Sequence, residues 1–230
     1  MKSSFHLFLG LCILALCVSC GRKTENYASK EHGKKFDSWE LYFHADEYDV
    51  YWPSIRLSKP AEGTLTVIKS TYNNWGRHLI GRDTTSATAF FKPIIYSVKS
   101  RNDAKYYNSI RIQVNDAKKE FWPGLEHTFT FNEGKKDSVS FSAKAENRDY
   151  FKPSREISEK IIELLSQKTS VSVKITFKGS SVEGVYDFNI KGSPELKKAL
   201  KINTERKIQA QKEFEKEDAK IVKQLEDILS

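Results

Sequence analysis

Apolar and polar residues alternate along most of the chain between positions 37 and 192. The clearest runs, at 109–114, 127–131 and 171–177, carry isoleucine, valine or phenylalanine at alternate positions. Such alternation is typical of strands with one buried and one solvent-facing side, which form antiparallel sheets. We therefore predict a mainly β (α+β) domain over residues 37–192, built as an antiparallel β-sandwich or one strongly curled sheet. Further strands are predicted at 39–44, 50–57, 64–69, 89–91, 94–99, 139–145 and 184–190.

Proline and glycine set the expected strand ends. The sequence Pro-Ala-Glu-Gly at 60–63 predicts a turn before the next strand, and Pro93 predicts a break between the strands on either side of it. The sequence Asn-Asn-Trp-Gly-Arg at 73–77 indicates a loop. These positions divide the β-rich region into short segments.

One helix is expected within this region, at residues 154–166. Ser154 can cap the free amides of its first turn, and Ile157, Ile161 and Leu164 recur on one face. We expect this face to cover the sheet.

A long helix is expected at the C-terminal end, over residues 193–230. Ser193 and Pro194 are typical of a helix start, and neither proline nor glycine follows. A continuous helix here would be roughly 50 Å long, so part of it should project from the domain. One of its two heptad lines (Thr204, Gln211, Asp218, Leu225) is polar at three of four positions, which argues against a coiled coil except at the helix end. Its last turns carry an apolar face that we expect to fold back onto the domain, or else to dock a partner or second copy: Ile221, Val222, Leu225, Ile228 and Leu229.

The chain begins with a short apolar segment. Lys2 precedes an uncharged run from residue 5 to 19, and Ser19 comes directly before Cys20. Spanning a bilayer takes about 20 apolar residues, so residues 1–19 fit a signal peptide better than an anchor. The arrangement resembles the signal peptide and lipobox of bacterial lipoproteins, although Cys17 stands where that motif usually has an aliphatic residue. The resemblance implies that Cys20 is acylated, palmitate included, and becomes the first mature residue.

Residues 20–36 lack apolar periodicity and predict a flexible tether. Five basic and two acidic residues lie between positions 21 and 36. Gly21 stands where the lipoprotein resemblance would place aspartate for retention at the inner membrane, so the outer membrane is the expected location in the bacterial envelope.

Cysteine content and charge narrow the classes of function. The three cysteines are Cys12, Cys17 and Cys20, so a mature chain has one thiol, which excludes disulfides, cysteine zinc sites and thiol catalysis. The net charge is +8, with acids interleaved among the bases, which is typical of a solvated mixed-charge surface. We expect no nucleic-acid role.

No catalytic motif accompanies these features. Each histidine after the signal lacks a second histidine at ligand spacing, and Asp46, Glu47 and Asp49 lack the glycine turn and distal glutamate of a calcium loop. We predict no metal, no cofactor and no enzymatic activity. The four histidines are His32, His44, His78 and His127.

Aromatic residues form the one candidate binding surface. Several lie close together near position 45, and Trp75 and Arg77 lie in the loop-like segment 73–77. Aromatic rings beside polar groups suit sugar rings, but packing in a β core is the commoner role for such residues. The candidates are Trp39, Tyr48, Tyr51, Trp52, Trp75 and Arg77.

The order strand, helix, strand, strand, helix, seen as a hydrophobic pattern around residues 154–202, is similar to small envelope sandwich proteins of the invasion-associated locus B type. From all these features we expect a lipid-anchored envelope protein that acts by binding or assembly. The alternative is a glycan-binding or glycan-active protein that uses the aromatic surface. The expected partners are the membrane, through the lipid, and another envelope protein or a polysaccharide.

Overall fold

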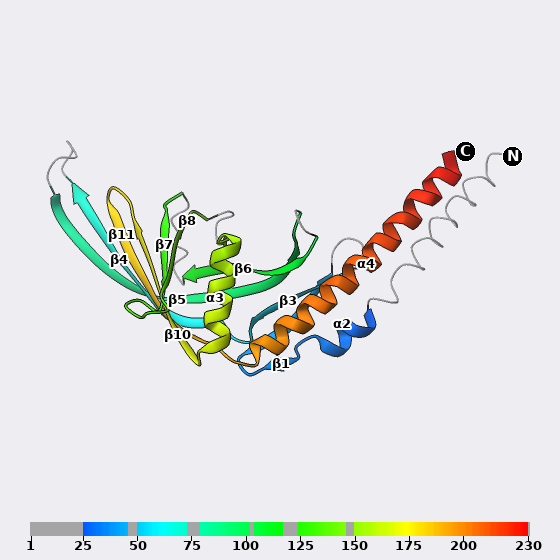
Figure 1. Ribbon diagram of the computed structural model, residues 1–230. Coiled ribbons are helices and arrows are strands. Elements are labelled where there is room, and N and C mark those ends of the chain that lie inside the picture. Colours follow the sequence, from blue (N-terminus) through cyan, green and yellow to red (C-terminus); the bar gives the residue numbers. More distant parts are fainter. Residues whose placement is uncertain are drawn as a thin grey trace.

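The computed structural model describes residues 25–45, 50–72, 79–101, 104–116, 124–145 and 150–229. These residues form one antiparallel sheet of 11 strands in the order β1-β2-β3-β5-β4-β11-β10-β7-β8, with β6 paired to β5 and β9 paired to β6 (Figure 1). The strands are β1 (Lys35–Phe36), β2 (Trp39–Ala45), β3 (Tyr51–Leu57), β4 (Ala61–Tyr72), β5 (Leu79–Lys99), β6 (Tyr106–Asp116), β7 (His127–Phe131), β8 (Val139–Ala143), β9 (Tyr150–Phe151), β10 (Ser170–Lys178) and β11 (Val182–Lys191). The helices are α2 (Glu25–Glu31), α3 (Arg155–Gln167) and α4 (Leu196–Leu229).

The sheet is a single, strongly curled layer, so the second of the two predicted architectures is correct. The 21-residue strand β5 organises it. Its first part pairs with β4 on one edge, and its second part pairs with β6 on the opposite edge. Strand β3 then continues the first edge through only two pairs, Ile55 with Ile95 and Arg56 with Ile94.

Two predicted strand breaks are wrong. Pro93 lies inside β5, at a gap in the pairing along one edge. On this edge, the residues of β5 up to Phe91 pair with β4, and those from Ile94 pair with β3. Proline is tolerated at such a gap in the ladder. Gly63 lies inside β4, where a Cβ atom would approach the Asp187 carbonyl oxygen to 2.1 Å. This glycine permits close packing of β11 and does not mark a turn.

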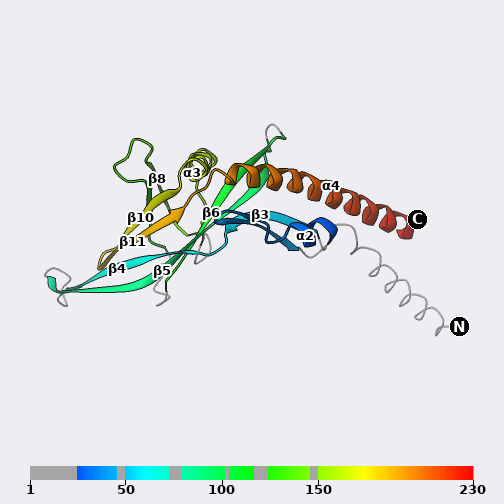
Figure 2. The ribbon, with the colours of Figure 1, turned by 90° about the horizontal axis from the view of Figure 1, so that it is seen from below.

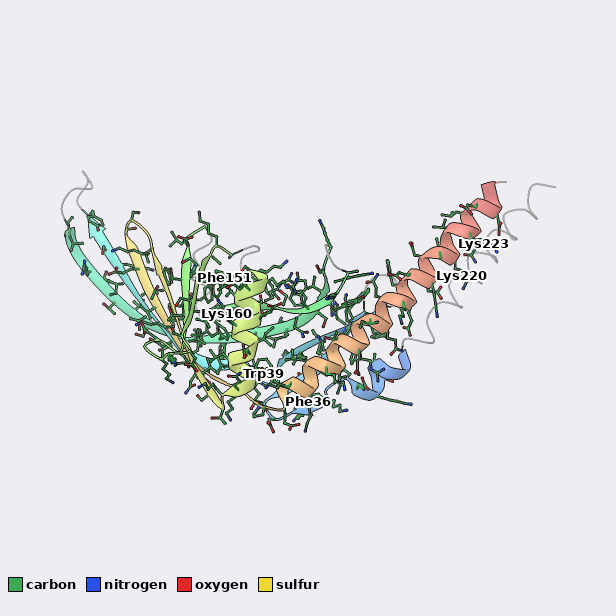
Figure 3. All side chains as sticks on the ribbon, viewed as in Figure 1. Phe36, Trp39, Phe151, Lys160, Lys220 and Lys223 are labelled. Carbon is green, nitrogen blue, oxygen red and sulfur yellow. The ribbon has the colours of Figure 1, made fainter. Side chains whose placement is uncertain are left out.

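Helix α3 covers the sheet as the sequence predicts. Ser154 accepts a hydrogen bond from the Ile157 amide at 3.4 Å, and Ile161 and Leu165 are fully buried. The helix packs against β6, β8 and β10, and Phe151 of β9 is fully buried (Figure 3).

Helix α4 begins on the sheet and runs out beyond it (Figures 1 and 2). Leu196, Ala199, Asn203 and Ala210 have no exposed surface, whereas most residues after position 214 are exposed. The helix packs against β3, β5 and β2 over this first part. Lys220 and Lys223 therefore lie on the projecting part (Figure 3).

The predicted fold-back of the helix end is wrong. Ile221, Val222 and Leu225 are 41%, 48% and 54% exposed. The helix is straight enough to carry these residues past the sheet edge, because its polar middle offers no apolar stripe that would hold it down. The side chains of Ile228 and Leu229 lie outside the described residues.

The N-terminal segment differs from the flexible tether that the sequence predicted through residue 36. Helix α2 and strand β1 fold within it, and Ala28 and Phe36 are only 3% and 7% exposed. Arg206 of α4 forms an ion pair with Glu31 of α2. Single apolar residues without periodicity gave no signal for this packing, because their partners lie in β2 and α4.

Candidate functional site

A cleft of about 490 Å³ opens where β3 separates from β5. Strands β2, β3, β5, β6 and β9 contribute to its lining, and α4 contributes Lys207. Because β3 pairs with β5 at only two positions, Trp52 and Ser54 lie beyond the last pair, at the fork. The separation of the two strands thus creates the cleft.

The pairing register places the lining side chains on one face. Arg56 of β3 lies opposite Ile94 of β5, and Ile94 lies opposite Arg111 of β6. Residues that lie opposite each other in an antiparallel ladder project to the same side of the sheet. Lys92 shares that side because it lies two positions from Ile94. Tyr42 joins them through its pairing with Ser54, and Tyr150 through its pairing with Gln113.

The cleft is strongly cationic. Arg56, Lys92, Arg111 and Lys207 line it, and none of the described lining residues is acidic. Glu40 lies beside the cleft and forms an ion pair with Arg56 at 2.8 Å. Within the part of the chain that the structure describes, Lys92 and Arg111 have no ion-pair partner.

Aromatic rings hold three of the four cations. The Arg56 guanidinium lies 3.6 Å from the centre of the Tyr42 ring, and the Lys207 ammonium lies 3.6 Å from that of Trp52. The Arg111 guanidinium lies 5.4 Å from the ring of Tyr150. Cation–π attraction orients these groups without neutralising their charge. The rings therefore support the cations instead of presenting free faces.

Two buried donors in the cleft lack acceptors. The Arg111 Nε and the Tyr96 hydroxyl are buried, and no described residue accepts a hydrogen bond from either. A buried donor without a partner costs about 1–3 kcal/mol, so an acceptor bound in the cleft would stabilise these two groups. Burial and the nearby charge of Arg56 lower the pKa of Lys92, and Glu40 partly offsets this effect.

A polar network fixes α4 against the cleft. The Ser97 hydroxyl of β5 donates to Asn108 Oδ1 at 2.9 Å, and Asn203 of α4 donates to the Ser97 oxygen at 3.0 Å. Thr204 lies 3.1 Å from the same hydroxyl. Lys207 follows Asn203 by one helical turn, so this network sets the position of the Lys207 ammonium over Trp52.

The structure separates the residues of the predicted aromatic surface. Trp39 is fully buried and its Nε1 donates to the Lys191 carbonyl at 3.1 Å, so its prediction as a surface residue is wrong. It packs into the core because it occupies the inward position of β2. Tyr51 packs against the core, and Trp52 lines the cleft. The other candidates, Tyr48, Trp75 and Arg77, lie outside the described residues, as does Cys20.

The described histidines do not gather into a metal site. His32 Nδ1 accepts a hydrogen bond from the Phe43 amide, and His127 is buried beside Phe151 and Phe177. Burial lowers the pKa of His127, and a hydrogen bond with the Leu125 carbonyl partly offsets this. Across the described ranges, no group of three His, Cys, Asp or Glu side chains could hold a metal ion. His78, Asp46, Glu47 and Asp49 lie outside the described residues.

Sequence reasoning missed the cationic residues of the cleft. Arg56, Lys92 and Arg111 each occupy the polar position of an alternating strand, which predicts only solvent exposure. Their separation along the chain hides their proximity, and only the strand register reveals it.

Comparison with protein families, with curated proteins and with solved structures finds no match. The resemblances to bacterial lipoproteins and to envelope sandwich proteins therefore stay predictions. No helix in the described part of the chain has both the length and the apolar character needed to cross a bilayer.

Proposed function

We propose that this protein is a lipid-anchored protein of the bacterial cell envelope, at the outer membrane, that binds a ligand in the cationic cleft and performs no catalysis. The observation that carries the binding role is the cleft, where unpaired cations and unsatisfied donors from separate strands converge on one face.

The anchor would hold one end of the molecule near the bilayer. Glu25 of α2 follows Cys20 by five positions, a distance of at most roughly 18 Å in an extended chain. Helix α2 is in turn fastened to α4 through the Glu31–Arg206 ion pair. A lipid on Cys20 would therefore keep the α2 side of the domain close to the membrane, much closer than a tether through residue 36 would.

The chemistry of the cleft favours binding over catalysis. General acid–base catalysis needs a group that can exchange a proton near neutral pH, and nucleophilic catalysis needs an activated nucleophile. The described lining hydroxyls of Ser54 and Ser97 are engaged with the Tyr42 carbonyl and with Asn108. No lining carboxylate is present among the described residues to activate them, and His44, which also lines the cleft, is not the hydrogen-bond partner of either hydroxyl.

Two measurements test this function. Cells fed an alkyne-tagged palmitate should label the wild-type protein but not Cys20→Ala, and equal labelling of both would refute the anchor. For the cleft, the immobilised mature protein should retain material from a protease-treated envelope extract. Ile94→Trp, which fills the cleft floor, should abolish retention.

Val98→Trp is the matched control, because Val98 lies on the same face of the same strand, paired with Tyr107 and away from the cleft lining. It should retain the material as the wild type does. Equal retention by Ile94→Trp and the wild type would refute the binding role of the cleft, provided that both variants melt cooperatively.

Within the described cleft, the glycan alternative takes a changed form. Stacking of a sugar on Trp52 would compete with Lys207 and with Phe214, whose ring centre lies 6.2 Å away, and Trp39 is buried. In the cleft, a glycan ligand would therefore have to be recognised through charged groups that it carries.

Assembly through α4 is the second candidate. The exposed apolar side chains of Ile221, Val222 and Leu225 on a projecting helix favour it. Sedimentation of the mature protein in detergent should then show an oligomer that Leu225→Lys dissociates. A monomer at all concentrations would refute self-assembly through this face.

A further inference from the structure

Three cations surround one apolar residue in the cleft. Arg56 and Arg111 lie directly opposite Ile94 on its two neighbouring strands, and Lys92 lies two positions along β5, diagonal to both. Directly opposed residues have Cβ atoms about 5 Å apart and diagonal ones roughly 7 Å, so long side chains from all three can converge on one bound group.

This cluster is unfavourable in the free protein. The charge of Arg56 lowers the pKa of Lys92, so like charges in this cluster repel, and only Arg56 is matched by an acid, Glu40. In addition, the buried Arg111 Nε and the Tyr96 hydroxyl offer hydrogens that no described residue accepts. A negatively charged acceptor would relieve both the repulsion and the missing hydrogen bonds.

Taking the cleft as the binding site proposed above, we infer that its ligand carries a phosphate or carboxylate group, which Lys92, Arg111 and Tyr96 bind over Ile94. Charge-assisted hydrogen bonds from a guanidinium and an ammonium to an oxyanion are about twice as strong as neutral ones. The cleft volume of about 490 Å³ suits a ligand, or one unit of a polymer, of the size of a sugar.

Other ligand classes fit the cleft less well. A cationic ligand would meet four positive side chains, and a neutral sugar would find the rings of Tyr42 and Trp52 already covered by Arg56 and Lys207. The same anionic chemistry can come from a free phosphorylated or acidic sugar, from a polymer unit, or from a lipid headgroup, and the experiment distinguishes these sources.

The test uses the mature protein in a neutral detergent, with binding followed by calorimetry at low salt. The probes are glucose 6-phosphate, galacturonate and, as the neutral match, glucose. We expect the anionic probes to bind and to weaken as salt is added, and glucose not to bind. Vesicles of phosphatidylglycerol, compared with phosphatidylcholine, test the headgroup as the source.

Variants assign the binding to the cluster. Lys92→Gln and Arg111→Gln should each lower the affinity for glucose 6-phosphate about tenfold or more. Lys197→Gln removes the same charge from an exposed position of α4 outside the cleft and should leave the affinity unchanged. Equal binding of glucose and glucose 6-phosphate, or full affinity in both cleft variants, would overturn the inference.

A second readout follows Lys92 itself. Its pKa is lowered in the free protein, so a bound anion should raise it. Isotope-labelled methyl groups on the lysines, with the Lys92 signal assigned from Lys92→Arg, would report this titration by NMR. If a saturating anionic probe leaves the midpoint of the Lys92 titration unchanged, contact between the anion and Lys92 is refuted.

The inference and the proposed function fail differently. If Ile94→Trp loses the extract material while Lys92→Gln and Arg111→Gln still retain it, the cleft binds its ligand without recognising an anion. Extract material retained equally by Ile94→Trp and the wild type would instead refute the cleft as the binding site.

Discussion

Arg111→Met should stabilise the free protein while it removes anion binding. The substitution deletes the buried, unpartnered Nε, which costs about 1–3 kcal/mol, and removes a charge that repels Lys92 and Arg56. It also loses the contacts of the guanidinium with Tyr150 at 5.4 Å and Tyr96 at 5.7 Å, together worth about 1 kcal/mol. The net gain is about 1 kcal/mol, which corresponds to a rise in Tm of about 2–4 °C.

Arg56→Met is the matched control, since it changes the same residue type on the same face. Arg56 forms an ion pair with Glu40 at 2.8 Å and a cation–π contact with the Tyr42 ring at 3.6 Å. Its loss therefore leaves the largely buried Glu40 carboxylate without its ion-pair partner. We expect Tm to fall, by an amount that corresponds to about 1–2 kcal/mol.

Thermal unfolding of the mature protein, followed by circular dichroism without ligand, measures both variants. With a saturating anionic probe, the wild type should have a higher Tm than Arg111→Met, because ligand binding stabilises only the wild type. A Tm of Arg111→Met that falls as far as that of Arg56→Met would show that the guanidinium is satisfied in the free protein, and the reasoning would fail.

Three further predictions concern the fold. Trp39→Phe should lower the free energy of unfolding by about 1–2 kcal/mol in chemical denaturation, because it removes a buried hydrogen bond and leaves a cavity; an unchanged midpoint would contradict the buried position. The ion pair of Arg206 lowers the pKa of Glu31 below 4.5, so its stabilisation is complete above that pH and is lost as the pH falls through the folded pKa. Glu31→Gln should therefore melt below the wild type at pH 7, and the gap should narrow as the pH falls below 4.5; a gap that does not narrow on acidification would refute this account. Ile221→Lys should leave Tm within about 1 °C, since its side chain is 41% exposed, and a larger fall would show that this face is covered.

The sequence determined the local structure of most elements that bury one regular face. The strand at His127–Phe131 has the predicted bounds, and α3 begins next to its predicted capping serine. Prediction failed where burial gave no pattern. The first part of β5, from Leu79 to Ser86, is exposed throughout, so it carries no alternation, and no pattern predicted this half of the strand. The lipid anchor at Cys20 is a prediction from sequence alone.

The site was decided by tertiary structure. The sequence predicted that Arg56 and Arg111 lie in separate strands and left Lys92 at the expected break beside Pro93, and it predicted no more than that. Strand register brought them around Ile94, and the separation of β3 from β5 opened a cleft above them. Periodicity reports which side of a strand is buried, because the hydrophobic effect acts on each residue locally. Which polar sides meet depends on pairing between distant segments, and that is fixed only when the whole sheet forms.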